Sequence, residues 1–232
     1  PSLPAGAATG LLVHEVLEGA DFRSRGGAPE LAEQILRRHG QPEAWRDELV
    51  DVVEATARVP LTLGRGLSAS LVQSGGGVPE LEFTLPLKPS SQWQRELRDA
   101  LVAEGGIFER YAAELPKLAI DRVAGFVRGF IDWAGEIESR AVVIDYKSNL
   151  LSDYGEAALE QAMIDHHYVL QALVYSVAAR RFIVSRGVEL LFGGAHYLFL
   201  RGLDPSGRGV ASLHPSDTLL AAFEGALLGA GA

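Results

Sequence analysis

The chain has 232 residues, and its composition, 47% hydrophobic and 22% charged, is close to that of an ordinary soluble globular protein. The formal net charge is −9, whereas a protein that binds nucleic acid on its own usually carries a basic face. The absence of cysteine excludes disulfides and thiolate metal sites. No apolar run is long enough to cross a bilayer, and the start of the chain lacks the features of a signal peptide. The chain does not begin with Met, which is compatible with a fragment of a longer protein.

The first third of the chain is helical in pattern. Apolar residues spaced three and four apart, with Pro and Gly near the ends, predict helices over residues 9–20, 28–40 and 41–58. The period then changes to two over residues 75–87, which predicts a strand that ends at Pro86. The SGGG segment at 74–77 precedes this strand rather than opening a helix. We therefore predict a flexible loop there and no phosphate-binding turn.

The rest of the chain alternates between helical and extended patterns. A helix is predicted over 90–106, and the pattern over 107–128 is ambiguous, with a helical interpretation for LAIDRVAGFVRG (118–129). Two strands follow within 129–149, and then two helices within 154–186 that meet near 165–168. The last predicted elements are a strand over 194–202 and a helix over 214–228 with Ser216 as its cap. With no long linker and no repeat, these elements predict one α/β domain over 1–232. Its parts are a helical N-terminal part (1–74), a core with a small mixed sheet flanked by helices (75–204), and a C-terminal helix (214–228).

The stretch GFIDWAGEIESRAVVIDYKSN (129–149) carries charged residues within two otherwise apolar strands. Side chains alternate across a strand, so Asp145 and Lys147 should share a face, and Asp132 on the neighbouring strand can reach that face if the register allows. Burying carboxylates is costly unless they are paired or bind a cation. Two carboxylates that converge suit a hard cation such as Mg²⁺, and a nearby lysine can stabilise charge on a phosphate. A plain salt bridge at the end of a sheet explains the same spacing, and the spacing alone does not decide between the two.

More of the sequence resembles the PD-(D/E)xK nuclease superfamily, and within it the RecB nuclease family. The residues that carry the resemblance are GFID (129–132), IDYKSN (144–149), QALVY (171–175), and GLLVH (10–14). The blocks LEFTLPL, QAMIDHHYVLQALVYSVAARRF and FGGAHYLFLRGLD are similar to the C-terminal nuclease domain of the helicase–nuclease subunits of that family. The resemblance runs from about His14 to Asp204, and it implies a restriction-endonuclease-like fold and hydrolysis of DNA phosphodiesters.

The resemblance also assigns roles to single residues. It implies that His14, Asp132, Asp145 and the backbone carbonyl of Tyr146 are metal ligands, that Lys147 is the catalytic lysine, and that Gln171 and Tyr175 lie near the scissile DNA. Glu80 and Glu82 fall where the family has an acidic strand, with a less defined role. Considered without the resemblance, His14 is no better a candidate than His196, and Gln171 and Tyr175 are ordinary packing residues on one helical face. His166 and His167 are expected to be exposed at a helix junction.

The implied cofactor is Mg²⁺, with Mn²⁺ as a substitute and Ca²⁺ as an ion that binds without supporting cleavage. The implied partners are DNA, single-stranded or unwound, a helicase portion of the same longer chain, RecC- and RecD-like subunits, and RecA. The implied setting is cytoplasmic double-strand-break repair and recombination. Two alternatives stay open: a catalytically silent module that binds DNA ends or a partner, and a stand-alone exonuclease. No Walker A motif occurs in the chain, so any ATP-driven motor lies outside these residues.

Overall fold

The computed structural model describes residues 3–24, 26–64, 66–118 and 125–229. Its α-helices are α1 (Ala7–Gly19), α2 (Ala28–Arg38), α3 (Arg46–Arg58), α4 (Trp93–Glu104), α5 (Gly106–Tyr111), α6 (Glu156–Asp165), α7 (Tyr168–Ser185) and α8 (Asp217–Phe223). Its strands are β1 (Leu61–Thr62), β2 (Ser68–Ala69), β3 (Ser74–Leu87), β4 (Gly125–Ile137), β5 (Arg140–Lys147), β6 (Leu191–Phe199) and β7 (Val210–Leu213). Short 3-10 turns lie at Glu43–Trp45, Leu71–Gln73, Ala112–Lys117 and Leu200–Gly202, and a π-helical turn lies at Glu224–Leu228.

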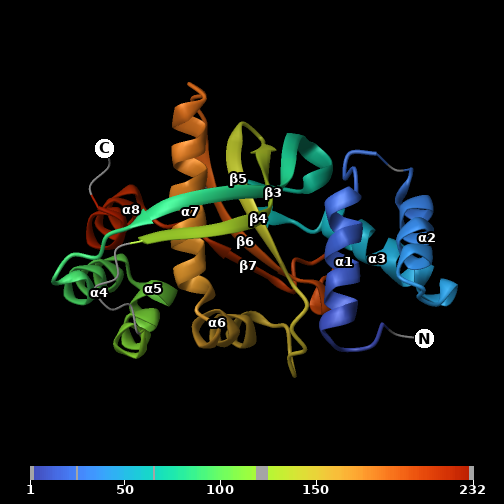
Figure 1. Cartoon of the computed structure of the whole chain (residues 1–232), viewed down its shortest axis with the longest axis horizontal. Coiled ribbons are helices and arrows are strands. Elements are labelled where there is room, and N and C mark those ends of the chain that lie inside the picture. Colours follow the sequence, from blue (N-terminus) through green and yellow to red (C-terminus); the bar gives the residue numbers. More distant parts are fainter. Residues whose placement is uncertain (1–2, 25, 65, 119–124, 230–232) are drawn as a thin grey trace.

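The main sheet has five strands in the order β3-β4-β5-β6-β7. Only the β5–β6 pair is parallel among these strands, and the connection between them is made by α6 and α7. Figure 1 shows α1, α2 and α3 together at one end of the molecule, and α7 crossed by β3 and β4. The sheet is therefore mixed and flanked by helices, which confirms the predicted restriction-endonuclease-like α/β fold.

Strand β5 is buried on both faces, which explains its continuous apolar sequence. Val142 and Ile144 belong to a core that the sheet shares with α1, α2 and α3. Val143, on the opposite face, belongs to a second core that the sheet shares with α4, α6, α7 and α8. The sheet thus lies between two apolar layers, and any charged side chain within it has to be compensated locally.

Most predicted elements are confirmed, with boundaries shifted by a few residues. The helices within 154–186 do separate near 165–168, where His167 adopts a left-handed conformation with φ 56°. Ser216 caps α8, because its Oγ accepts a hydrogen bond from the Leu219 N–H. The short β1–β2 pair and strand β7 were not predicted, since two to four residues are too few to show a period.

Two predictions about local structure are wrong. The SGGG segment is not a loop but the first part of β3, and its Gly77 pairs with Gly135 of β4. The helical interpretation of 118–129 fails for 125–129, which begin β4, while 119–124 lie outside the described residues. In the first case the glycines serve packing, because a Cβ on Gly77 would lie 2.3 Å from the Trp133 ring. Residues 125–129 form a strand because they pair with β3, although their sequence pattern by itself is ambiguous.

No helix in the described part of the chain is long and apolar enough to span a membrane. The division of the chain into one domain with three parts stays a prediction.

Candidate active site

Strands β4 and β5 separate where the sequence places its carboxylates. They form a hairpin whose last pair is Trp133↔Ile144, and β4 then continues with β3 alone while β5 continues with β6. We call this point of separation the fork. Asp132 is the first residue past the fork on β4, and Asp145 the first on β5. The separation leaves space between two strands that would otherwise be closed by hydrogen bonds.

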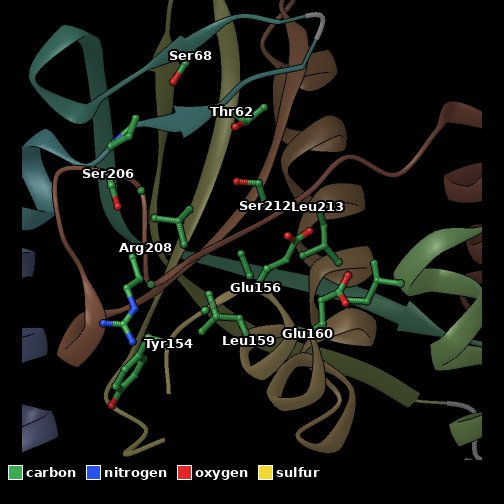
Figure 2. Close-up of a pocket in the computed structure, with 17 residues that line it drawn as sticks. Thr62, Ser68, Tyr154, Glu156, Leu159, Glu160, Ser206, Arg208, Ser212 and Leu213 are labelled. Carbon is green, nitrogen blue, oxygen red and sulfur yellow. The ribbon is translucent and has the colours of Figure 1, made fainter. Parts of the chain in front are cut away.

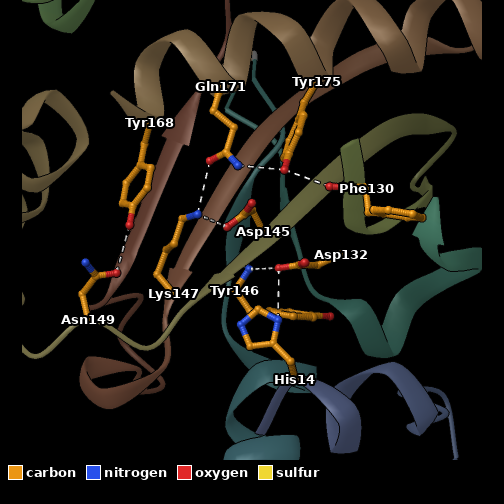
Figure 3. Close-up of polar contacts among 10 residues, drawn as sticks. All are labelled: His14, Phe130, Asp132, Asp145, Tyr146, Lys147, Asn149, Tyr168, Gln171 and Tyr175. Atoms are coloured by element: carbon orange, nitrogen blue, oxygen red, sulfur yellow. Dashed lines mark hydrogen bonds and ion pairs between the residues drawn. The ribbon is translucent and has the colours of Figure 1, made fainter. Parts of the chain in front are cut away.

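Asp145 and Lys147 share the face of β5 that α7 covers. Asp145 is only 4% exposed, and its Oδ2 lies 2.5 Å from the Lys147 Nζ. Lys147 also donates a hydrogen bond to Gln171 Oε1 at 3.2 Å, and Gln171 Nε2 donates to the Tyr175 hydroxyl at 2.8 Å. These contacts form a continuous chain between β5 and α7 (Figure 3).

This chain of hydrogen bonds ends on β4. The Tyr175 hydroxyl donates to the backbone carbonyl of Phe130 at 2.9 Å, two residues before Asp132. Gln171 and Tyr175 are one helical turn apart, so a single face of α7 contacts both strands of the fork. The predicted pair thus holds Lys147 in place and ties α7 to the strand that carries Asp132.

Asp132 is held by the backbone of the opposite strand. Its Oδ2 accepts a hydrogen bond from the Tyr146 N–H at 2.6 Å, so the carboxylate replaces the β4 backbone partner that Tyr146 lacks past the fork. The same Oδ2 lies 3.7 Å from His14 Nδ1, on α1 (Figure 3). Gly10, one turn before His14, lets α1 approach β5 closely, because a Cβ there would lie 3.0 Å from Ser148 Oγ. The glycine of the G-x-x-x-H motif thus lies at a close contact between α1 and the segment that follows β5.

Aromatic side chains surround the lysine, and the sequence did not single them out. The Lys147 Nζ lies 3.9 Å from the centroid of Tyr168 and 5.3 Å from that of Tyr197. The Tyr168 hydroxyl donates to Asn149 Oδ1 at 3.2 Å. Cation–π contacts hold an ammonium in place without adding negative charge beside it. Only the tertiary structure identifies Tyr168, since it comes from the helix junction and Tyr197 from β6.

The structure separates the two acidic residues of β3. Glu80, with φ 48°, lies between Pro79 and Leu81, which pair with Trp133 and Ile131 on either side of Asp132. Burial, followed by the charges of Glu18 and Asp145, raises the pKa of Glu80. Glu82 is exposed like Glu80 but forms an ion pair with Arg128, with 2.6 Å between Oε1 and Nε. The charge of Glu80 therefore acts on the carboxylates of the fork, whereas that of Glu82 is paired with Arg128.

Burial and mutual repulsion dominate the electrostatics at the fork. Burial, followed by the charge of Asp145, raises the pKa of Asp132 to about 7, although the Tyr146 N–H opposes the shift. Burial also raises the pKa of Asp145, against the opposing effect of Lys147. The pKa of His14 is lowered, mainly by burial, so its imidazole is favoured in the neutral form that binds metals. Carboxylates that resist ionisation in this way are typical of sites completed by a cation.

The donor set fits a hard divalent cation, although the ligands are not gathered around one point. In the described part of the chain, no group of three or more His, Asp or Glu is close enough to form a metal site as it stands. The cause is visible in the contacts: Asp145 is engaged by Lys147, and Asp132 by the Tyr146 N–H. Asp145 Oδ2 is buried, and the Lys147 ammonium 2.5 Å away is its positively charged partner. A buried carboxylate oxygen that takes a cationic partner is also suited to a hard metal cation.

Other candidate residues lie elsewhere. His196 is fully buried, with Nδ1 2.8 Å from Ser212 Oγ, whereas His14 lies beside Asp132. His166 is exposed at the helix junction as predicted, but His167 is half-buried and contacts the Tyr111 hydroxyl at 3.0 Å.

A cleft of about 670 Å³ lies near β7 and the start of α6 (Figure 2). None of the predicted site residues lines it. Two of its charged residues, Arg208 and Glu160, form ion pairs with Asp153 and Arg110. This cleft and the candidate residues of the fork are therefore separate features of the molecule.

The fork, with its paired carboxylates and lysine on a mixed sheet, can be compared with known families. The sequence matches the PD-(D/E)XK nuclease superfamily over residues 2–226, and the chain belongs to this superfamily. It is 31% identical over 231 residues to the RecBCD enzyme subunit RecB of Escherichia coli, and this alignment covers 95% of the chain and 19% of the relative.

Related subunits from other bacteria give the same result. The RecB subunit of Mycolicibacterium smegmatis is 31% identical over 245 residues, covering 92% of the chain and 22% of the relative. The RecB subunit of Mycobacterium tuberculosis H37Rv is 32% identical over 250 residues, and this alignment covers 93% of the chain and 22% of the relative. These matches confirm the resemblance to the RecB nuclease family. The chain spans about a fifth of the length of the curated relatives that it matches.

Proposed function

We propose that this chain is a divalent-metal-dependent deoxyribonuclease that hydrolyses phosphodiester bonds at the fork between β4 and β5. The observation that carries the proposal is the convergence of Asp132, Asp145 and Lys147 there, in a chain that belongs to a nuclease superfamily. Buried carboxylates with raised pKa values are costly at this position, and apolar residues would close the two strands at lower cost.

The residues divide into those that hold the ion and those that act on the phosphate. Asp132, Asp145, the carbonyl of Tyr146 and His14 would hold Mg²⁺, with Glu80 as a further carboxylate. The ion would supply charge neutralisation and a more acidic bound water. Mn²⁺ would substitute, because it shares the octahedral oxygen preference and accepts imidazole more readily, and Ca²⁺ would bind without supporting cleavage.

Lys147 is the cation that this chain itself offers to the phosphate. Its ammonium is anchored by Gln171 and by the Tyr168 ring, so little reorganisation is needed when a phosphate replaces Asp145 as its partner. Gln171 and Tyr175 act as positioning residues, since they fix Lys147 and the Phe130 segment of β4.

The biological setting is proposed from the relatives. We infer that the domain serves recombination and double-strand-break repair in the cytoplasm as part of a longer helicase–nuclease chain, with RecC- and RecD-like subunits and RecA as partners. The matched region's share of the RecB subunits supports this, at 19 to 22% of their length. A catalytically silent binding module is less favoured, because the carboxylates and the lysine of the fork are all present. A stand-alone exonuclease remains the second enzymatic candidate.

The proposal is tested by cleavage of linear single- and double-stranded DNA with Mg²⁺ present or chelated. Asp145→Asn and Lys147→Ala should each reduce the rate by a factor on the order of 10² or more, because each removes charge stabilisation at the phosphate. Lys117→Ala is the matched control, since that exposed lysine pairs only locally with Glu114. Cleavage at the parent rate by either folded fork variant, or full activity in EDTA, would refute the proposal.

A further inference from the structure

Strands β3 and β4 extend well beyond the fork as a two-stranded ribbon. Residues 81–87 of β3 pair with residues 125–131 of β4, and β5 takes no part in this region. The inner face of the ribbon packs on α7, with Ile131 in the core and Phe83 in edge contact with Tyr175. Because side chains alternate, the neighbouring residues of both strands lie on the opposite, outer face.

The outer face of β4 carries two exposed aromatic rings that flank an arginine. Phe126 is 76% exposed and Phe130 is 46% exposed, and Arg128 lies between them. We call Phe126, Arg128 and Phe130 the aromatic face. In Figure 3 the Phe130 ring points away from the polar groups of the fork, while its carbonyl accepts the Tyr175 hydroxyl. The two rings are four residues apart, which corresponds to about 13 Å along a strand.

The aromatic face lies on the strand that leads to the fork, and this position suits a ligand that extends to the fork. It belongs to the same strand as Asp132 and stops two residues before it, so a ligand lying on it is led directly to the fork. Exposed aromatic rings spaced along a surface stack the bases of single strands, and an arginine between them suits the phosphates. Arg128 is paired with Glu82, but both side chains are exposed, and such a pair is weak enough for a phosphate to displace the carboxylate.

The net charge of the chain makes a stacking surface useful. With 30 acidic and 21 basic residues, the protein gains little from releasing counterions. Stacking depends on contact between base and ring rather than on net charge, so it provides affinity that an acidic chain can use.

We propose that the aromatic face binds single-stranded DNA by base stacking and guides the strand to the fork. This inference rests on the proposed nuclease function for its biological meaning, but binding can be measured without cleavage. Bases in a duplex are stacked on one another and are not available to the rings, so the aromatic face contributes to the binding of single strands only.

The test is a titration of a fluorescently labelled 20-nucleotide single strand with the 232-residue chain in EDTA, compared with a blunt duplex of the same length. Phe126→Ala and Phe130→Ala should each weaken single-strand binding at least about fivefold and leave duplex binding unchanged. The slope of log affinity against log salt should not change, because no charge is removed. Phe182→Ala is the matched control, an exposed phenylalanine near the C-terminal end of α7.

The outcomes separate this inference from the proposed function. If the parent chain cleaves DNA but both ribbon variants bind the single strand like the parent, the inference is overturned, and the rings are left as a contact surface for a protein. Equal losses on single strand and duplex would also overturn it. If the variants lose single-strand affinity but the parent cleaves nothing with Mg²⁺, the aromatic face stands and the nuclease proposal fails. Urea midpoints within error of the parent establish that the variants are folded.

Discussion

At the scale of single residues, Asp132 has the most informative surroundings. Its carboxylate is confined by the Tyr146 N–H on one side and by the negative charges of Asp145 and Glu80 on the other. A pKa raised to about 7 means that the folded protein holds a proton there that the unfolded chain releases near pH 4. Asp132 therefore makes the metal-free fold less stable as the pH rises through this range, and a bound cation would reverse the effect.

A substitution at Asp132 tests this linkage. In EDTA, Asp132→Asn should gain about 1 kcal/mol of unfolding free energy relative to the parent between pH 6 and pH 8, because only the parent then acquires a buried charge. Urea unfolding at both pH values measures the difference, with the exposed Asp51→Asn as control. Using the difference between variants removes the opposing effect of His196, whose pKa is lowered to about 3 by burial. A constant difference between pH 6 and pH 8 would contradict the prediction, because it would show that Asp132 does not titrate in this range in the folded protein.

At the scale of elements, the β3–β4 ribbon determines where Asp132 lies. The Trp133 side chain, adjacent to Asp132, lies over the glycines where the two strands pair, Gly77 and Gly135. A Cβ on Gly77 would lie 2.3 Å from the indole ring, so the ring can occupy this place only because the position is glycine. The glycine-rich start of β3 thus anchors the residue next to the fork.

Gly77→Ala should therefore destabilise the protein by about 1–3 kcal/mol, since the added methyl group forces Trp133 to move. Gly75→Ala is the matched control, because a Cβ there meets only Glu136 at 3.5 Å, an ordinary contact. Urea denaturation and tryptophan fluorescence measure both effects. Equal stability of the two variants would mean that the indole has an alternative position at no cost.

At the scale of the whole molecule, an acidic charge and a DNA substrate are in conflict. A net charge of −9 gives little non-specific affinity for DNA, and the aromatic face supplies only a few stacking contacts. The conflict disappears if a motor on the same longer chain delivers the strand, because tethering then replaces intrinsic affinity with effective concentration. The relatives, of which this chain spans about a fifth, are long enough to include such a motor.

The isolated chain should accordingly bind single-stranded DNA weakly at physiological salt and cut it slowly and without sequence preference. Cleavage should increase strongly when the chain is joined to the helicase portion. A titration in Ca²⁺, which is expected to block cleavage, measures the affinity at a salt concentration that screens surface charges beyond about 8 Å. Nanomolar binding by the isolated chain would contradict delivery and favour the stand-alone exonuclease.

The sequence by itself determined which of the candidate residues share a face of a strand or a helix. Alternation placed Asp145 and Lys147 on one face of a buried strand, and the helical repeat placed Gln171 and Tyr175 on one face of α7. Most helices and strands were predictable for the same reason, because burial imposes a period on consecutive residues. The resemblance added His14, which no local pattern distinguishes from His196.

Only the tertiary structure decided how these residues are arranged. Strand pairing between distant segments decides where β4 and β5 separate and makes the glycines at 74–77 strand residues. It also places Glu80 near the fork and the aromatic rings around Lys147. Pairing and packing between segments far apart leave no period in the local sequence, since the partner of each residue is fixed by the path of the whole chain. The sequence therefore identified the carboxylates and the lysine, and the fold determined that β4 and β5 separate at the point where these groups lie.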